Sequence, residues 1–316
     1  MPSDVPVPLS ILRPGGVRTR IGGGVIGHTA ARSGRPPRSR NRPVPPRGGP
    51  SPLGLLPVTE PEDTAATAPA PENGGTPSAT PDERRGVVSF VRRGTRLQGK
   101  QLAAWERLSG HYLVDVPRGT AATSVDPSAR FDAAAVFGRS APLVVEIGSG
   151  LGDAVVAAAA ADPGTDFLAL DVYRPGLSDL MRKADTAGAA NIRVIEANAP
   201  DVFTTLIAAG SVDEVWMFFP DPWPKKRHHK RRLVSPGFAD LVARVLRPGG
   251  VWRLATDWEE YAQQMRQTLD EVPAFSPANE GHDGFAERFA GRIETGFERK
   301  GMAAGRVIRD LTYRRR

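Results

Sequence analysis

A glycine loop in the middle of the sequence is the first feature that could do chemistry. Its residues are Glu146-Ile147-Gly148-Ser149-Gly150-Leu151-Gly152-Asp153, directly after an apolar run. Glycines at this spacing let the backbone turn tightly from a strand into a helix and approach a ligand without a Cβ in the way. A dinucleotide-binding G-x-G-x-x-G would need glycine at 153, where aspartate stands. The loop therefore indicates either another nucleoside-type ligand or a purely structural turn.

An acidic residue stands where such a ligand would need one. Asp171 ends the next apolar run, 19 residues after Gly152, and a carboxylate there can accept hydrogen bonds from both ribose hydroxyls. A G-x-G-x-G preceded by an acid, here Glu146, is typical of sites for S-adenosylmethionine, whose cationic sulfonium suits nearby carboxylates. The loop and Asp171 together favour this cofactor.

The second chemical signal is a proline-rich turn followed by a strongly basic run. The turn is Pro220-Asp221-Pro222-Trp223-Pro224, and the run is Lys225-Lys226-Arg227-His228-His229-Lys230-Arg231-Arg232. Arginine and lysine can neutralise nucleic-acid phosphates, and Trp223 offers a flat surface for a base. Taken alone, such a run also fits a solvated face. Its place beside the expected cofactor pocket favours contact with RNA.

Asp221 is the predicted catalytic residue, because prolines on both sides stiffen the turn and help to fix its carboxylate. A purine nitrogen such as guanine N7 already has an in-plane lone pair, so its methylation needs no general base. It needs orientation toward the methyl group and compensation for the positive charge that develops on the ring. An aspartate on a rigid turn supplies both.

Other reaction classes lack the residues they need. Cysteine is absent, which excludes disulfides, thiolate zinc sites and a cysteine nucleophile. His28, His111 and His282 are isolated in the sequence, so no metal site is predicted. No nucleophile elbow precedes the histidines of the basic run, so a Ser-His-Asp set has no support.

Short β-branched runs alternate with helical stretches from residue 143 onward, and these elements must position the residues above. The pattern predicts strands over 143–147, 166–171, 192–195, 212–219 and 251–255, and helices over 153–161, 174–187, 236–246 and 257–269. This alternation predicts an α/β, doubly wound, mostly parallel sheet of the Rossmann-like class, with ligands at the carboxyl ends of its strands. Arg299-Lys300-Gly301 and Gly305 predict paired antiparallel strands over 295–316, at the sheet edge.

The first 84 of the 316 residues differ in composition from the rest. All 12 Phe, 5 Trp and 4 Tyr lie at or after Phe90, while 17 of the 30 prolines lie in residues 1–84. A segment of this kind cannot bury enough apolar area to offset its chain entropy. We therefore expect residues 1–84 to be a disordered tail and residues 85–316 to form one globular domain.

Charge and hydropathy add expectations about location and partners. Residues 1–50 carry nine arginines against the single acid Asp4, which fits an RNA-touching arm, a solvated linker or a stretch upstream of the true start. No apolar run approaches the roughly 18 residues that cross a bilayer, and the N-terminus is a poor secretory signal. A cytoplasmic protein without a membrane partner is expected.

From about residue 87 to residue 316, the sequence resembles the bacterial tRNA (guanine-N7-)-methyltransferases. The elements that carry the resemblance occur in order: Ser89–Arg96 (SFVRRGTR), the glycine loop, Phe218–Trp223 (FFPDPW), the basic run, Ala255–Trp258 (ATDW) and Thr295–Gly301 (TGFERKG). The PDPWPKKRHHKRR stretch is the most specific of them. The resemblance implies methyl transfer from S-adenosylmethionine to N7 of a guanine in the tRNA variable loop, leaving 7-methylguanosine and S-adenosylhomocysteine.

The resemblance also implies roles for individual residues. The cofactor positions are Glu146, Gly148, Gly150, Gly152, Asp171, Asn198 and Asp221, the last of which is also the active-site residue. The substrate tRNA positions are Lys225, Arg227, Lys230, Arg231, Arg232, Asp257, Thr295, Phe297 and Glu298. It implies no metal and no obligate protein partner, and leaves a monomer or a homodimer open.

Three positions depart from the family pattern. Asn198 stands where Asp is usual, and its amide oxygen can still accept a hydrogen bond from an adenine amino group. Asp171 stands where Glu is common, and Ile293 where Pro is expected.

Two other classes of protein remain open: a non-catalytic RNA-binding protein, suggested by Asn198, and a nicotinamide-dependent oxidoreductase, against which Asp153 counts. Affinity for S-adenosylmethionine separates the first from an enzyme, and a dinucleotide titration tests the second.

Overall fold

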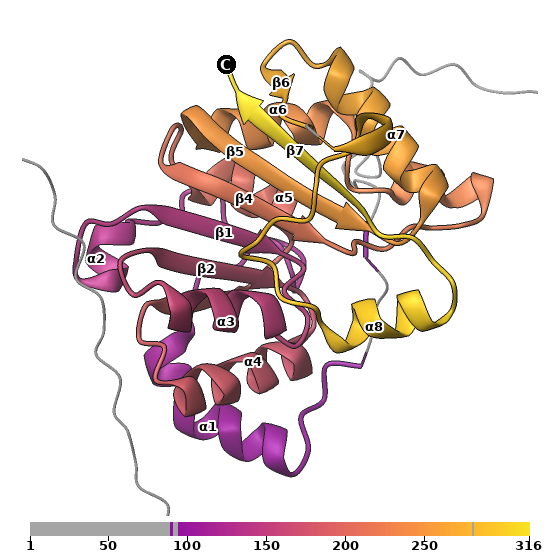
Figure 1. Ribbon diagram of the computed structural model, residues 1–316. Coiled ribbons are helices and arrows are strands. Elements are labelled where there is room, and N and C mark those ends of the chain that lie inside the picture. The colour runs from indigo at the N-terminus through magenta and orange to yellow at the C-terminus, as the bar shows by residue number, and fades with distance from the viewer. Residues whose placement is uncertain (1–88, 91–93, 280) are drawn as a thin grey trace, which may run out of the picture. The chain divides into compact units, whose positions relative to one another are not determined.

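One mixed sheet of seven strands forms the centre of the computed structural model, which describes residues 89–90, 94–279 and 281–316 (Figure 1). The strand order is β3-β2-β1-β4-β5-β7-β6. The strands are β1 (Leu143–Ile147), β2 (Asp166–Asp171), β3 (Ile192–Glu196), β4 (Val212–Phe218), β5 (Leu246–Thr256), β6 (Phe275–Pro277) and β7 (Arg309–Arg315). The first five pair in parallel, and β7 runs antiparallel to both β5 and β6. The predicted fold class is confirmed.

Helices cover both faces of this sheet. They are α1 (Lys100–Tyr112), α2 (Ala133–Phe137), α3 (Asp153–Ala161), α4 (Arg174–Ala187), α5 (Ala199–Asp201), α6 (Pro236–Val245), α7 (Glu259–Glu271) and α8 (Gly296–Ala303). Figure 1 shows α1, α3 and α4 together on one face, with α6 and α7 on the other. All five residues of β1 are buried, which explains why four of them are apolar and do not alternate with polar residues.

The two faces have separate apolar clusters, and β1 contributes to both. Val145 and Ile147 pack in the cluster that includes α6 and α7, while Val144 packs in the cluster of α1, α3 and α4. Successive side chains of a strand point to opposite faces of the sheet. The core therefore fixes the register of β1 and, with it, the position of the glycine loop that follows.

The C-terminal stretch differs from the prediction of paired strands. Residues Gly296–Ala303 form α8, because the Thr295 side chain accepts a hydrogen bond from the backbone N–H of Glu298 and so caps the helix. The residues predicted as a turn around Gly301 therefore lie inside a helix. Only β7 is a strand there, and it inserts between β5 and β6 rather than pairing with a neighbour from its own stretch.

Other boundaries differ in smaller ways. β5 begins at Leu246 and runs through the turn predicted at 247–250, with Gly249 at φ 77°. Helices α1 and α2 and strand β6 were not predicted.

All described residues belong to one compact unit. The predicted tail, residues 1–84, lies outside the described residues, so the boundary at 85 stays a prediction. No helix among the described residues has the length and apolar character needed to span a bilayer.

Candidate active site

A cavity of about 760 Å³ lies at the carboxyl ends of the parallel strands. Residues that the sequence predicted from separate motifs line it together, because parallel strands bring their carboxyl ends to one edge of the sheet. These residues are Glu146, Gly148, Gly150, Asp171, Asn198, Asp221, Asp257, Thr295 and Phe297. Residues from the start of helix α8 also line the cavity, among them Gly296 and Lys300. Most of the predicted cofactor positions, and three of the predicted substrate positions, thus line one cavity.

The glycine loop takes a backbone course that residues with a Cβ would resist. Gly148, Gly150 and Gly152 have φ values of 72°, 55° and 75°, in the left-handed region that favours glycine. A Cβ at Gly152 would also lie 2.3 Å from Cγ of Leu180 on α4. Gly152 therefore lets α3 and α4 pack closely and does not itself line the cavity. The other two glycines leave the backbone open to a ligand.

Asp171 is held in place by the loop it was predicted to accompany. Its Oδ2 accepts a hydrogen bond of 2.7 Å from the backbone N–H of Gly150, and its Oδ1 accepts one of 2.9 Å from Tyr173. These contacts aim a half-buried carboxylate at the end of β2, beside the end of β1. The shorter side chain, compared with glutamate, suits these close backbone donors.

Glu146 is a buried carboxylate at the end of β1. Its Oε2, like the hydroxyl of Ser149, has no hydrogen-bond partner among the described residues. Burial, followed by the charges of Asp171 and Asp153, raises the pKa of Glu146 from 4.5 to about 8, against a hydrogen bond from the Val155 backbone. A buried carboxyl group without a partner in the cavity lining fits a donor or cationic group of a ligand, whose binding would favour the ionised form.

The hydrogen bonds around Asn198 explain why this residue is an amide and not a carboxylate. Its Nδ2 donates to the Thr123 carbonyl at 2.8 Å and to Oδ2 of Asp201 at 2.9 Å, while its Oδ1 accepts from the Asp201 backbone N–H at 2.9 Å. An ionised aspartate here has no proton for the first two contacts and would face the Asp201 carboxylate. Oδ1 keeps a second lone pair that can accept a further hydrogen bond.

The turn that carries Asp221 is strained at both ends. Phe219 and Trp223 have φ values of 55° and 45°, which is uncommon for residues other than glycine. The Phe219 N–H donates to the Ala255 carbonyl at 2.7 Å, and the Trp223 indole N–H donates to the Ser89 carbonyl at 3.2 Å. Neighbouring segments therefore hold the turn in a conformation that the isolated chain would avoid.

Arg232 belongs to this turn and not to an exposed surface. Its side chain is buried, its Nε donates to the Pro222 carbonyl at 2.9 Å, and its guanidinium lies 4.9 Å from the ring centre of Tyr261. Its Nη2 also lies 3.6 Å from Oε1 of Glu260, at ion-pair distance. The expectation that Arg232 contacts RNA is therefore corrected: it holds the backbone beside Asp221. Sequence position alone gave no sign of this, because the arginine ends a run of exposed bases.

The rest of the basic run forms the 3₁₀ helix η2 (Lys226–Arg231) and faces outward. Lys225, Lys226, Arg227 and Lys230 are exposed, whereas Arg231 is half-buried with its guanidinium 5.0 Å from the Trp223 ring centre. Arg231 thus covers part of the surface predicted to receive a base. The exposed four remain the candidates for phosphate contact.

The substrate positions on α8 separate into two groups. Thr295 caps the helix, and Phe297 is 54% exposed at the cavity mouth, with its ring centre 5.2 Å from that of Phe219. Glu298 has no solvent exposure and pairs with Arg292 at 2.7 Å and with Arg288. An entirely enclosed carboxylate cannot reach RNA, so the expectation for Glu298 is corrected to an internal ion pair.

Asp257 follows β5 and is paired with a residue that no motif singled out. Its Oδ2 lies 2.5 Å from the guanidinium of Arg306, which also lines the cavity. Arg306 lies in the loop after α8, far from Asp257 in the sequence, so only the tertiary fold brings the two side chains together. It places one cation and one carboxylate at the same side of the cavity.

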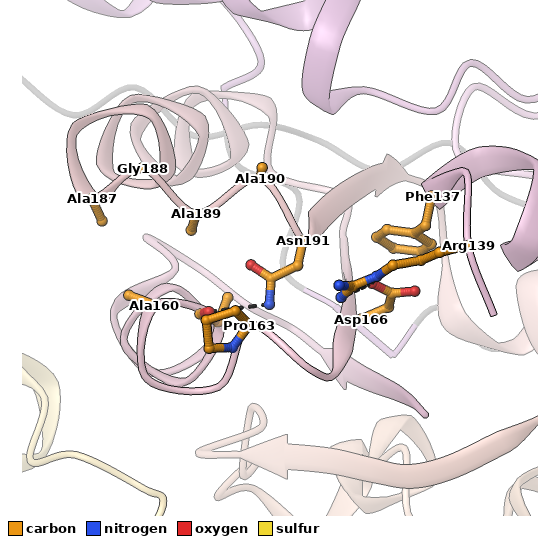
Figure 2. Close-up of a pocket in the computed structure, with 11 residues that line it drawn as sticks. Phe137, Arg139, Ala160, Pro163, Asp166, Ala187, Gly188, Ala189, Ala190 and Asn191 are labelled. Carbon is orange, nitrogen blue, oxygen red and sulfur yellow. Dashed lines mark hydrogen bonds and ion pairs between the residues drawn. The ribbon is translucent and has the colours of Figure 1, made fainter. Parts of the chain in front are cut away.

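A second, smaller cavity of about 290 Å³ lies at the opposite edge of the sheet, near the starts of β2 and β3 (Figure 2). Its charged and amide side chains are already committed. Arg139 pairs with Asp166 at 2.6 Å, and Nδ2 of Asn191 donates to the carbonyls of Ala159, Asp162 and Thr165. These contacts join elements to each other, so the cavity offers no comparable set of unpaired groups for a ligand.

Comparison with known proteins identifies the family. The family model described as "Putative methyltransferase" matches residues 140–311. The tRNA (guanine-N(7)-)-methyltransferase of Paenarthrobacter aurescens is 48% identical, over 72% of this chain and 91% of that protein. The protein of the same name from Cutibacterium acnes is 51% identical, over 73% of this chain and 84% of that protein. This chain belongs to the tRNA (guanine-N(7)-)-methyltransferase family.

The match to the methyltransferase family model contains every residue assigned above to the site, from Glu146 to Glu298. Among solved structures, that of the 16S rRNA methyltransferase KamB has a TM-score of 0.43 and 18% identity, over 70% of this chain and 97% of that one. The family resemblance inferred from the motifs is confirmed. Neither Arg306 nor Arg292 was identified from the sequence. Tertiary contacts bring Arg306 into the cavity lining and pair Arg292 with Glu298 on α8.

Proposed function

We propose that this methyltransferase transfers the methyl group of S-adenosylmethionine to N7 of a guanine in the variable loop of tRNA, giving 7-methylguanosine and S-adenosylhomocysteine. The observation that carries the proposal is the place of Asp221. Asp221 lines the same cavity as Glu146 and Asp171, and its turn continues along the chain into the exposed bases of Lys225 and η2. A cofactor and an anionic polymer bound at these two places would meet at Asp221.

The donor groups of the cavity fit S-adenosylmethionine. When bound, the cofactor supplies an electrophilic methyl group on a sulfonium centre. The open backbone at Gly148 and Gly150 leaves room for the methionine part, and the Asp171 carboxylate is aimed to accept ribose hydroxyls. The unpaired Oε2 of Glu146 then gains a donor. Asn198 retains one acceptor lone pair for the adenine amino group.

Asp221 acts on the substrate by charge and placement. Guanine N7 attacks the methyl carbon with its own lone pair, so no residue has to remove a proton first. Positive charge develops on the purine ring as the bond forms, and a fixed carboxylate stabilises it without having to reorganise. The exposed ring of Phe297 supplies a surface on which the purine can stack at the cavity mouth.

The tRNA is held by charge outside the cavity. Lys225, Arg227 and Lys230 can neutralise phosphates along the backbone, and Lys226 extends the same surface. We place Thr295, Asp257 and Arg231 at the margin of this contact. We also propose a cytoplasmic location, where tRNA is present, and action as a monomer or homodimer, to be decided from the mass in solution.

The decisive experiment is transfer of labelled methyl from S-adenosylmethionine to unmodified tRNA, with the product nucleosides resolved by mass spectrometry. A 7-methylguanosine peak is expected. Folded protein that binds tRNA but yields no methylated nucleoside would favour the RNA-binding alternative.

Glu146 predicts a pH dependence of stability in the cofactor-free protein. Its pKa of about 8 exceeds the ordinary 4.5, so between these values the folded state holds a proton that the unfolded state has released. The free energy of unfolding should therefore fall as pH rises through this window. Glu146→Gln removes the titration and should make the fall smaller. Urea denaturation at about pH 5.5 and about pH 8.5 measures both; parallel curves for the two proteins would contradict the prediction.

A further inference from the structure

Arg292 carries a charge that the fold encloses completely. The residue is 2% exposed, and its side chain is among the largest buried side chains of the described residues. Its Nη1 lies 2.7 Å from Oε2 of Glu298 on α8. Its Nε and Nη2 lie 3.1 and 2.8 Å from the two carboxylate oxygens of Asp310 on β7. A planar guanidinium with two carboxylates in its plane has fixed orientation as well as fixed position.

The same guanidinium lies over two aromatic rings, one at the end of β4 and one directly after it. Its central carbon lies 5.6 Å from the ring centre of Phe218 and 5.5 Å from that of Phe219, within the range of cation–π attraction. Phe219 is the residue with φ 55° that begins the turn to Asp221. The Arg292 side chain therefore contacts the ring of Phe219, the strained residue two positions before the carboxylate of Asp221.

The backbone of Phe219 is tied to the same neighbours. Its N–H donates to the carbonyl of Ala255, and Ala255 lies opposite Asp310 in the pairing of β5 with β7. Asp310 in turn binds Arg292. Backbone, ring and buried charge thus form a closed set of contacts around one residue whose conformation is unfavourable by itself. Persistent strain of this kind requires surroundings that over-determine it.

We propose that Arg292 is a positioning residue that fixes Asp221 through Phe219. This inference rests on the proposed function. The ion pairs to α8 and β7 hold the guanidinium, the guanidinium holds the Phe219 ring, and the ring sets the direction in which Pro220 and Asp221 leave the sheet. Arg292 does not line the cavity, so it acts on the reaction only through the turn.

Arginine has properties here that lysine lacks. Lysine keeps the positive charge and can pair with one carboxylate, but it has no planar fork for two carboxylates and no flat face for the rings. Arg292→Lys therefore keeps the positive charge but removes the planar group, and so tests whether the orientation of the guanidinium matters. Arg288 offers a matched control, because it also pairs with Glu298, yet it is partly exposed and has no ring contact with Phe218 or Phe219.

The test compares Arg292→Lys and Arg288→Lys with the unmodified chain in single-turnover methyl transfer at saturating cofactor and tRNA. We expect Arg292→Lys to lower this rate between about tenfold and a hundredfold, because small misplacement of a reacting group has effects of that size. The dissociation constants for S-adenosylmethionine and tRNA should change by less than about twofold. Arg288→Lys should retain the rate within about twofold.

Several outcomes would overturn the inference. An unchanged rate in Arg292→Lys, or an equal loss in Arg288→Lys, would mean that the ion pairs serve stability alone. Weaker tRNA binding with an unchanged rate would mean that Arg292 supports Phe297 and not Asp221. If thermal unfolding shows that Arg292→Lys is not folded, Phe219→Leu replaces it, since the ion pairs then stay intact; a normal rate in that variant rejects the proposal. Absence of 7-methylguanosine with the unmodified chain would instead reject the proposed function.

Discussion

Asp221→Asn is expected to lower the rate of methyl transfer about 10²- to 10³-fold while tRNA binds as before. The substitution keeps the size of the side chain and removes its negative charge. Loss of one preorganised electrostatic contact to a charge that develops in the transition state has effects of this order. The exposed bases of η2 are untouched, so the dissociation constant for tRNA should stay within about twofold.

The measurement is the single-turnover rate, together with tRNA binding at the same ionic strength. Asp240→Asn is the matched control, because it makes the same chemical change at an exposed position of α6 that does not line the cavity. It should leave both quantities unchanged. A normal rate in Asp221→Asn would remove this carboxylate from the reaction and leave placement of the guanine as the main contribution of the turn.

Replacement of Lys225, Lys226, Arg227 and Lys230 by alanine is expected to weaken tRNA binding and flatten its dependence on salt. Each phosphate contact contributes a slope of about 0.7 to 0.9 in the logarithm of affinity against the logarithm of salt concentration. Four lost contacts should therefore reduce the slope by about three. The rate at saturating tRNA should be nearly unchanged, since none of the four lines the cavity.

A second variant with the same change in net charge tests whether place or charge matters. Arg107, Arg182, Arg247 and Arg314 are exposed and lie on other parts of the surface, and their replacement by alanine should change the slope much less. Equal losses in the two variants would mean that tRNA responds to net charge alone. Arg232 is left intact in both, because its replacement would disturb the Asp221 turn.

The alternation of strands and helices was predictable because each kind of element has its own pattern of apolar residues along the sequence. The runs 143–147 and 166–171 consist mainly of apolar residues, with acids only near their ends, and both are strands with the predicted bounds. The C-terminal stretch was misread because Gly301 and Gly305 suggested turns. Thr295 and Glu298 have the spacing of a capping box, S/T-x-x-E, and this signal could have predicted the start of α8.

The site was predictable to the extent that sheet topology determines it. Glu146 and Asp171 lie at the carboxyl ends of β1 and β2, and Asp221 follows the end of β4, so a parallel sheet brings them to one edge. The burial of Arg232 and Glu298, and the pairing of Asp257 with Arg306, depend on which distant element packs against each residue. No local pattern contains that information, because an arginine that binds a carbonyl and one that faces solvent read alike in the sequence.

The position of β7 has a consequence for how the protein assembles. β6 precedes β7 in the chain, yet in the sheet it pairs only with β7. Until β7 is in place, β5 is an open edge with unpaired backbone groups along its length, and β6 has no strand to join. Such an edge is a template for pairing with other chains. Substitutions that weaken β7 should therefore reduce the yield of native protein through aggregation, before they alter any property of the molecules that do fold.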